Sequence, residues 1–344
     1  MPATTPPKPF PFDRDSLDQI SRYLAKKGLV PKNFRDTDKF VDVVSWNLRW
    51  FDHRDTRRIE AITEVMAEMN SDLFVLTEVA EDGALTEIVD KLAHRRAGYY
   101  STVYGTTGGQ QRVVLMWDRD WIRAKKDPIE LFKEEALTVK NEAGLKAEIF
   151  PRLPLWGYFE ALPAKNRKDQ EGFNFELVGL HMKSQMPPTG VRVKRGGIRQ
   201  RTQASERLVD WLTSPKEHFD EDVILVGDWN AKPSEEEWES LRALEKSGEI
   251  NFSNINPEGE ISHIARFNKS GPGGTRLDLH LINKTAAAAS IPKGSGLVIR
   301  WSLFDDLSVM ESDERQQLFR NFTHFVSDHL PVLSRFYTVD KDNA

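Results

Sequence analysis

The stretch VILVGDWNAKP, residues 223–233, combines an apolar strand with a polar turn. Its first four residues predict a buried strand that is bounded by Gly227. Asp228 and Asn230 follow, and in an extended chain their side chains point to the same face. A carboxylate and a carboxamide at a strand end suit a hard cation or a phosphate oxygen. The structural alternative is an Asx turn that only closes the strand.

Polar residues at or near the ends of other apolar strands repeat this pattern. They are Asn47, Glu78, His181, Asp278, and Asp328 with His329. Each has a structural alternative, such as a solvated carboxylate for Glu78 or a hydrogen-bonded core histidine for His181. A carboxylate inside an apolar strand is costly unless it is paired, and Arg276 is a candidate partner for Asp278. Together, these sites favour one functional centre over several independent structural roles.

The composition limits the class of protein. The chain has 344 residues, is 39% hydrophobic and carries a net charge of −5, so a sizeable core is expected and a globally basic surface is not. It has no cysteine, which excludes disulfides, thiolate nucleophiles and cysteine-based zinc sites. No run approaches the roughly 18 apolar residues of a membrane span. The location stays open: cytoplasmic, or secreted if a signal peptide was removed before Met1.

The hydrophobic patterns predict one α/β domain with mixed sheets over residues 40–338. Residues 1–39 indicate a Pro-rich tail and a short peripheral helix, and residues 339–344 a C-terminal tail. Residues 121–148 have no clear period, and residues 251–274, rich in Asn, Gly and Pro, predict a long loop.

Helices and strands are expected to alternate within this domain. Helices are predicted at residues 56–69 (capped by Thr56), 85–96, 199–212 and 234–247. Strands are predicted at residues 40–51, 73–76, 113–117, 151–161, 173–184, 223–226 and 277–282, with 151–161 and 173–184 forming a pair.

Six motifs occur in the order in which the endonuclease/exonuclease/phosphatase superfamily, best known from deoxyribonuclease I, carries them. They are WN (46–47), LTEV (76–79), LHMKS (180–184), GDWNAKPS (227–234), RLDLHLI (276–282) and SDHLPV (327–332). This resemblance spans about residues 40–338. It implies a four-layered α/β sandwich, in which two mixed, mostly antiparallel sheets pack face to face with helices outside. It also implies metal-dependent phosphoester hydrolysis.

The resemblance also implies a metal site. By position, Glu78 resembles the principal metal carboxylate of the superfamily, with Asn47 and Asp328 close by. Oxygen ligands of this kind suit Mg²⁺, with Mn²⁺ or Ca²⁺ as alternatives.

The remaining motif residues resemble catalytic groups of the superfamily. Asp228 and Asn230 match the pair that positions the nucleophile and the scissile phosphate. His329 and Asp278 match a histidine and its orienting carboxylate, and His181 matches the second histidine. A histidine beside a carboxylate can exchange a proton near neutral pH. Whether Asp228 or the Asp278–His329 pair orients the attacking water is left open.

Several basic residues are candidates for binding substrate phosphate. Arg152 resembles an Arg-x-Pro arginine of the deoxyribonuclease I branch, and Arg112 stands where that enzyme has an aromatic contact residue. The basic stretch GVRVKRGGIRQR, residues 190–201, follows His181 closely and can track a nucleic-acid backbone. The residues of this stretch expected to contact phosphate are Arg192, Lys194 and Arg195. A solvated loop is the alternative.

These observations favour a monomeric, Mg²⁺-dependent nuclease acting on DNA, with RNA as an alternative substrate. A second hypothesis is an enzyme with the same site that hydrolyses a phospholipid or a small phosphoester. A third is a non-catalytic binding module, against which the complete set of acid, amide and histidine residues argues. Trp50 and Phe51 are assigned to the core, with stacking on bases as the alternative.

Overall fold

The structure is a computed structural model. It describes residues 40–162, 172–187, 189–190, 192–252, 260–291 and 296–338. The predicted N-terminal tail and helix (1–39) and the C-terminal tail (339–344) lie outside the described residues.

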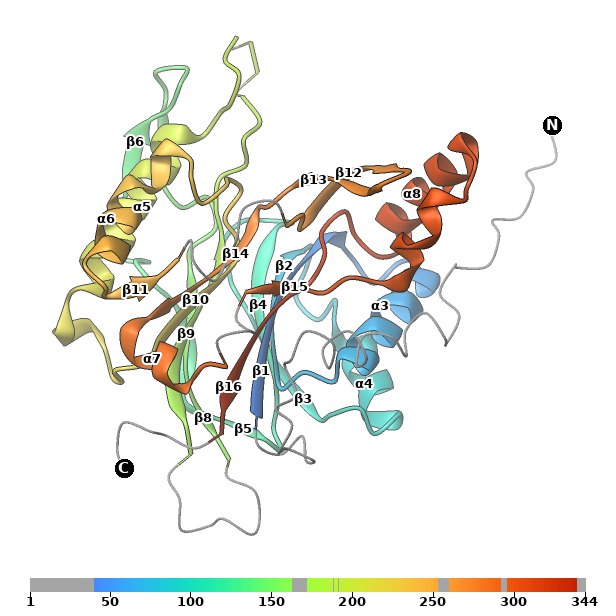
Figure 1. Cartoon of the computed structure of the whole chain (residues 1–344). Coiled ribbons are helices and arrows are strands. Elements are labelled where there is room, and N and C mark those ends of the chain that lie inside the picture. The colour runs from blue at the N-terminus through green and yellow to red at the C-terminus, as the bar shows by residue number, and fades with distance from the viewer. Residues whose placement is uncertain are drawn as a thin grey trace.

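The described strands form two six-stranded sheets (Figure 1). The first has the order β15 (Leu297–Val298), β16 (Val332–Tyr337), β1 (Phe40–Phe51), β2 (Leu73–Val79), β4 (Arg112–Asp118) and β3 (Tyr100–Tyr104). The second has the order β11 (Ile250–Asn251), β14 (Asp278–Asn283), β10 (Val223–Asp228), β9 (Asn174–His181), β8 (Leu155–Ala161) and β5 (Ile122–Glu130). Only β1–β2 and β9–β10 pair in parallel within these sheets; the other neighbours are antiparallel.

Helices cover the outer face of each sheet. Figure 1 shows α3 (Thr56–Met69), α4 (Thr86–His94) and α8 (Ser312–Phe325) beside the first sheet. It shows α5 (Ile198–Leu212) and α6 (Glu239–Lys246) beside the second. The short helix α7 (Lys284–Ala289) follows β14, and the 3₁₀ helices are η2 (Pro215–Glu217), η3 (Glu236–Trp238), η4 (Ser302–Phe304) and η5 (Asp306–Ser308). None of the described helices is long and apolar enough to cross a membrane.

Alternate side chains of a central strand pack into different layers of the core. In β10, Ile224 and Val226 pack between the two sheets, whereas Val223 and Leu225 pack in the outer core with α5 and α6. Strands buried on both faces need apolar residues at every position, as the run VILV has. The prediction of a four-layered α/β sandwich is confirmed.

Two local predictions need correction, and the structure also defines a segment whose sequence shows no clear period. The cap of α3 is Asp55, whose carboxylate accepts a hydrogen bond from the Arg57 amide at 3.0 Å, and not Thr56. Residues 121–148, which have no clear hydrophobic period, contain β5 and the hairpin β6 (Thr138–Lys140)–β7 (Lys146–Glu148). The predicted loop 251–274 contains the hairpin β12 (His263–Asn268)–β13 (Gly271–Thr275), because packing of Ile264 and Phe267 on the core outweighs the low strand propensity of GPGGT.

Candidate active site

The polar residues predicted from the strand ends meet at one edge of the two sheets. Asp228, the last residue of β10, pairs with His181 of β9 on one side and with Asp278 of β14 on the other. In the first sheet, Asn47 of β1 pairs with Thr77 of β2, one residue before Glu78. Because the two sheets pack face to face, these positions face one another across the interlayer space.

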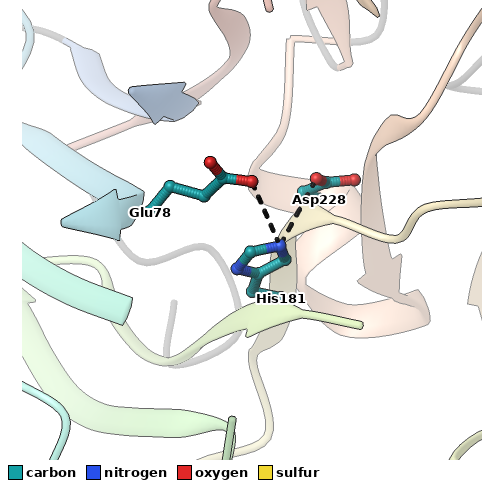
Figure 2. A group of neighbouring side chains, drawn as sticks. All are labelled: Glu78, His181 and Asp228. Carbon is teal, nitrogen blue, oxygen red and sulfur yellow. Dashed lines mark ion pairs between the residues drawn. The ribbon is translucent and has the colours of Figure 1, made fainter. Parts of the chain in front are cut away.

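Glu78, His181 and Asp228 form the centre of this edge (Figure 2). The Nε2 atom of His181 lies 3.8 Å from Glu78 Oε1 and 3.7 Å from Asp228 Oδ2. The side chain of Glu78 is 15% exposed, whereas those of His181 and Asp228 are each 2% exposed. Glu78 is therefore the carboxylate that a ligand from solvent reaches first.

Asn47 links the two carboxylates. Its Nδ2 donates to Glu78 Oε1 at 3.2 Å and to Asp228 Oδ2 at 3.0 Å. Its Oδ1 accepts from the Arg49 amide at 2.8 Å, which fixes the orientation of the carboxamide. One residue of the first sheet thus holds acidic groups of both sheets in place.

Asp278 and His329 form a second, directly bonded pair. His329 Nδ1 lies 2.7 Å from Asp278 Oδ2, and both side chains are buried. The Ser327 hydroxyl accepts from the His329 amide, and the Ser262 hydroxyl accepts from the Asp278 amide. Arg276 is not the partner of Asp278, because its guanidinium pairs with Glu260 at 3.1 Å and donates to the Gly296 carbonyl.

Burial and charge shift the titration of this cluster. Burial alone would lower the pKa of His329, but the negative charges of Asp278 and Asp228 outweigh it and raise that pKa to about 10. Burial raises the pKa of Asp228 to about 7, even though the His329 charge opposes the shift. Burial lowers the pKa of His181 well below its usual value, and Arg152 adds to this. At neutral pH, His329 is therefore cationic and His181 neutral.

The donor set fits a divalent cation. The ligand atoms of Glu78, His181 and Asp228 lie within 4.8 Å of one another, and so do those of Asp228, Asp278 and His329. His181 is neutral and so adds no positive charge to this group of carboxylates. Carboxylate and carboxamide oxygens are the donors that Mg²⁺ and Ca²⁺ prefer.

The sequence of residues 44–329 matches the model of the Endonuclease/Exonuclease/phosphatase family. The chain belongs to this family. Enzymes of the family generally hydrolyse phosphoester bonds with metal ions, which agrees with the acid and histidine clusters at the sheet edge.

Similar solved structures have the same fold at low sequence identity. The endonuclease/exonuclease/phosphatase from Bacteroides vulgatus is 11% identical, with a TM-score of 0.52, covering 87% of this chain and 99% of that chain. A family protein from Bacteroides thetaiotaomicron is 15% identical, with a TM-score of 0.52 and coverages of 87% and 98%. The human Nocturnin catalytic domain with bound sulfate is 16% identical, with a TM-score of 0.50 and coverages of 87% and 94%. No curated protein matches the sequence.

In this member of the family, Asp228 has two roles, because one carboxylate oxygen closes a turn and the other faces the site. Its Oδ1 accepts from the Asn230 amide at 2.9 Å, while its Oδ2 faces Asn47 and His181. The Asx-turn alternative and the site hypothesis are thus compatible. Asn230 is held by its Nδ2 on the Met182 carbonyl, at 3.1 Å.

Arg152 contributes an uncompensated positive charge beside the cluster. It is 6% exposed, and its Nη2 donates to the same Met182 carbonyl at 2.8 Å. No carboxylate of the described residues lies within 4.0 Å of its guanidinium. Burial lowers the pKa of Arg152 to about 10, although the charges of Asp228 and Glu78 oppose this. A buried arginine without a carboxylate partner suits an anionic ligand.

Two other predicted residues are held by partners outside the cluster. The Asp328 carboxylate pairs with Arg49 Nε at 3.2 Å and is not in either of the carboxylate–histidine groups found among the described residues. Arg112 pairs with the exposed Asp82 at 2.6 Å.

The predicted basic stretch divides into two parts. Arg195 pairs with Glu235 and Glu237, each at 3.1 Å, and so is anchored to the segment that contains η3. Arg192 and Lys194 are exposed, and no ion pair joins them to other described residues. These two residues, together with the exposed Arg199, keep charges that are available to a polyanion.

Sequence reasoning missed some residues at the site. The prediction that Trp50 lies in the core is wrong, because its side chain is 52% exposed, whereas its neighbour Phe51 is fully buried as predicted. Ser327 could have been found, because it directly precedes the Asp328–His329 pair. Ser262 could not, because it lies in a segment with a loop-like composition.

Proposed function

We propose that this chain is a divalent-metal-dependent phosphodiesterase, and specifically a nuclease that hydrolyses DNA. The observation that carries the proposal is the juxtaposition of Glu78, Asn47 and Asp228 with the hydrogen-bonded Asp278–His329 pair. Phosphodiester hydrolysis needs a cation that offsets negative charge, a hydrogen-bond donor for the phosphoryl group and a group that accepts a proton from the attacking water.

Glu78 is the residue that would hold the cation, which is expected to be Mg²⁺, and Asn47 orients this carboxylate through its Nδ2. When bound, the ion supplies positive charge that offsets the charge developing on the phosphoryl group. Arg152 provides further positive charge from the protein side of the cluster.

The other residues move or hold protons. Because Nδ1 of His329 faces Asp278, its Nε2 is the atom left to donate a hydrogen bond to a phosphoryl oxygen. His329 is already protonated, so it is a poor proton acceptor. Asp228 is the better candidate to accept a proton from the attacking water. Asn230 lies next to it, and its amide donates a hydrogen bond to Asp228 Oδ1.

The test is incubation of the purified protein with supercoiled plasmid and Mg²⁺, with and without a chelator. Nicking that the chelator abolishes supports the proposal. A parallel panel of single-stranded DNA, RNA, phospholipid and a small phosphodiester defines the substrate class. Hydrolysis of phospholipid alone would reject a nuclease.

A second candidate is a phosphoesterase that acts on a small substrate. The observation that favours it is the pairing of Arg195 with acidic residues, which leaves fewer basic groups for a long polyanion. Faster turnover of a small phosphodiester than of any oligonucleotide would favour this candidate.

A further inference from the structure

A bulge at the end of β1 places a tryptophan beside Glu78. The pairing of β1 with β2 runs to Asn47 opposite Thr77 and resumes at Phe51 opposite Val79. Three residues of β1 therefore stand opposite the single residue Glu78. Arg49 (φ 47°), Trp50 (φ 53°) and Glu78 (φ 58°) all adopt the left-handed conformation, which is unfavourable for residues other than glycine.

A buried arginine holds this bulge in place. The guanidinium of Arg58, from α3, donates to the carbonyl oxygens of Leu48, Arg49 and Trp50, the last two at 2.8 and 3.2 Å. Arg58 is only 9% exposed. The bulge is thus a fixed part of the fold.

The bulge keeps Trp50 in solvent at the edge of the site. Its amide donates to Glu78 Oε2 at 3.1 Å, so its main chain contacts the carboxylate that faces His181. Trp50 is 52% exposed, and no ring stacking or cation–π contact joins it to other described residues. An exposed tryptophan forfeits the burial that normally stabilises this side chain. Folding alone gives no reason for three strained residues to hold it there.

We propose that Trp50 is a stacking site for a nucleobase of the substrate, next to the phosphoester to be cleaved. The inference rests on the proposed nuclease function. A base is flat and uncharged, so it can stack on the indole beside the acidic cluster while its phosphate lies nearer Arg152 and the cation. Any of the bases can stack on an indole ring. The site would therefore favour nucleic acid over phosphoesters that carry no aromatic ring.

Fluorescence tests the contact without turnover. The chain has nine tryptophans, and Trp50 and Trp121 (36% exposed) are its exposed ones. Trp121 lies beyond the other end of the first sheet, where Trp117 pairs with Leu73, the first residue of β2. With chelator present, oligothymidylate should quench the emission of the wild type and of Trp121→Phe, and should quench Trp50→Phe much less. The same oligomer built from abasic sugars should quench none of them.

Kinetics test the consequence for specificity. The measured quantity is the ratio of kcat/KM for oligothymidylate to kcat/KM for an oligomer with abasic sugars flanking the cleaved bond. Trp50→Ala should lower this ratio roughly five- to a hundredfold, the value of stacking one base. Trp50→Phe should restore most of it, and Trp121→Ala should leave it unchanged.

The outcomes separate this inference from the proposed function. Equal losses on both oligomers would mean that Trp50 only supports the local fold, and an unchanged ratio would overturn the stacking site. If no nucleic acid is cleaved, the proposed function fails, and the quenching experiment still decides whether Trp50 binds bases. Quenching by phospholipid vesicles but not by oligothymidylate would overturn the inference in favour of a lipid contact.

Discussion

The Asp278–His329 pair should act as one unit, and replacing Asp278 by Asn tests this. The substitution keeps the shape but removes the charge that accepts the 2.7 Å hydrogen bond. A buried hydrogen bond to a charged group is worth about 1.5–3 kcal/mol, or roughly ten- to a hundredfold in rate. Asp278 is also the principal charge that raises the pKa of His329, so that pKa should fall in Asp278→Asn.

The assay is a double-mutant cycle on plasmid nicking, combined with an NMR titration of His329. His329→Ala should lose activity by about 10² or more, the value of general acid–base catalysis. If the pair is one unit, Asp278→Asn with His329→Ala should be scarcely worse than His329→Ala alone, whereas independent residues would give a loss of about 10³–10⁴. The exposed Asp210→Asn in α5 is the matched control. Additive losses in folded proteins, or an unchanged His329 pKa in Asp278→Asn, would refute the reasoning.

Three further predictions concern other regions. Glu78→Gln should lower activity about 10²-fold or more and shift the Mg²⁺ titration to higher concentration, because a neutral amide binds the cation more weakly. Replacing both Arg192 and Lys194 with Ala should reduce the salt dependence of DNA binding by a log–log slope of about 1–2, the contribution of two phosphate contacts. Burial lowers the pKa of His218, but its hydrogen bond to Glu176 outweighs this and the pKa is raised. His218 should therefore stabilise the fold below its unfolded pKa of about 6.5 and lose that contribution as the pH rises through its folded pKa; His218→Gln should flatten this decline in Tm.

Each of these predictions has a control. Glu134→Gln, on the exposed turn after β5, should leave the Mg²⁺ titration unchanged, and an equal shift in both variants would remove Glu78 from the cation site. Arg195→Ala should lower stability more than it lowers the salt dependence, because Arg195 pairs with Glu235 and Glu237. A pH profile of Tm that is identical in wild type and His218→Gln would contradict the third prediction.

The layers of the fold were predictable because their signal is local. The run VILV and its partners carry the period of buried strands, and the polar residue after each run marks the shared edge. The pairing of Asp278 followed from the cost of an unpaired buried carboxylate. The local sequence offered Arg276 as its partner, and only the family resemblance indicated His329, which lies 51 residues away and makes the contact.

Other features depend on tertiary contacts that leave no trace in a single sequence. The exposure of Trp50 follows from the left-handed bulge that Arg58 stabilises, and WNLRWF contains no glycine to signal it. The ion pairs of Arg195 with Glu235 and Glu237 join segments about forty residues apart. The sequence alone therefore overstates how many basic side chains of this stretch can bind phosphate. The hairpin β12–β13 forms from a Gly- and Pro-rich segment because the core accepts Ile264 and Phe267.

The most direct test of a cation site at Glu78 is Mn²⁺ binding, followed by the EPR signal of the free ion. The wild-type protein should remove Mn²⁺ from solution saturably, Mg²⁺ should compete, and Glu78→Gln should weaken the affinity by about tenfold or more. Glu134→Gln should bind as the wild type does. Equal Mn²⁺ affinity in the wild type and in folded Glu78→Gln would contradict the account.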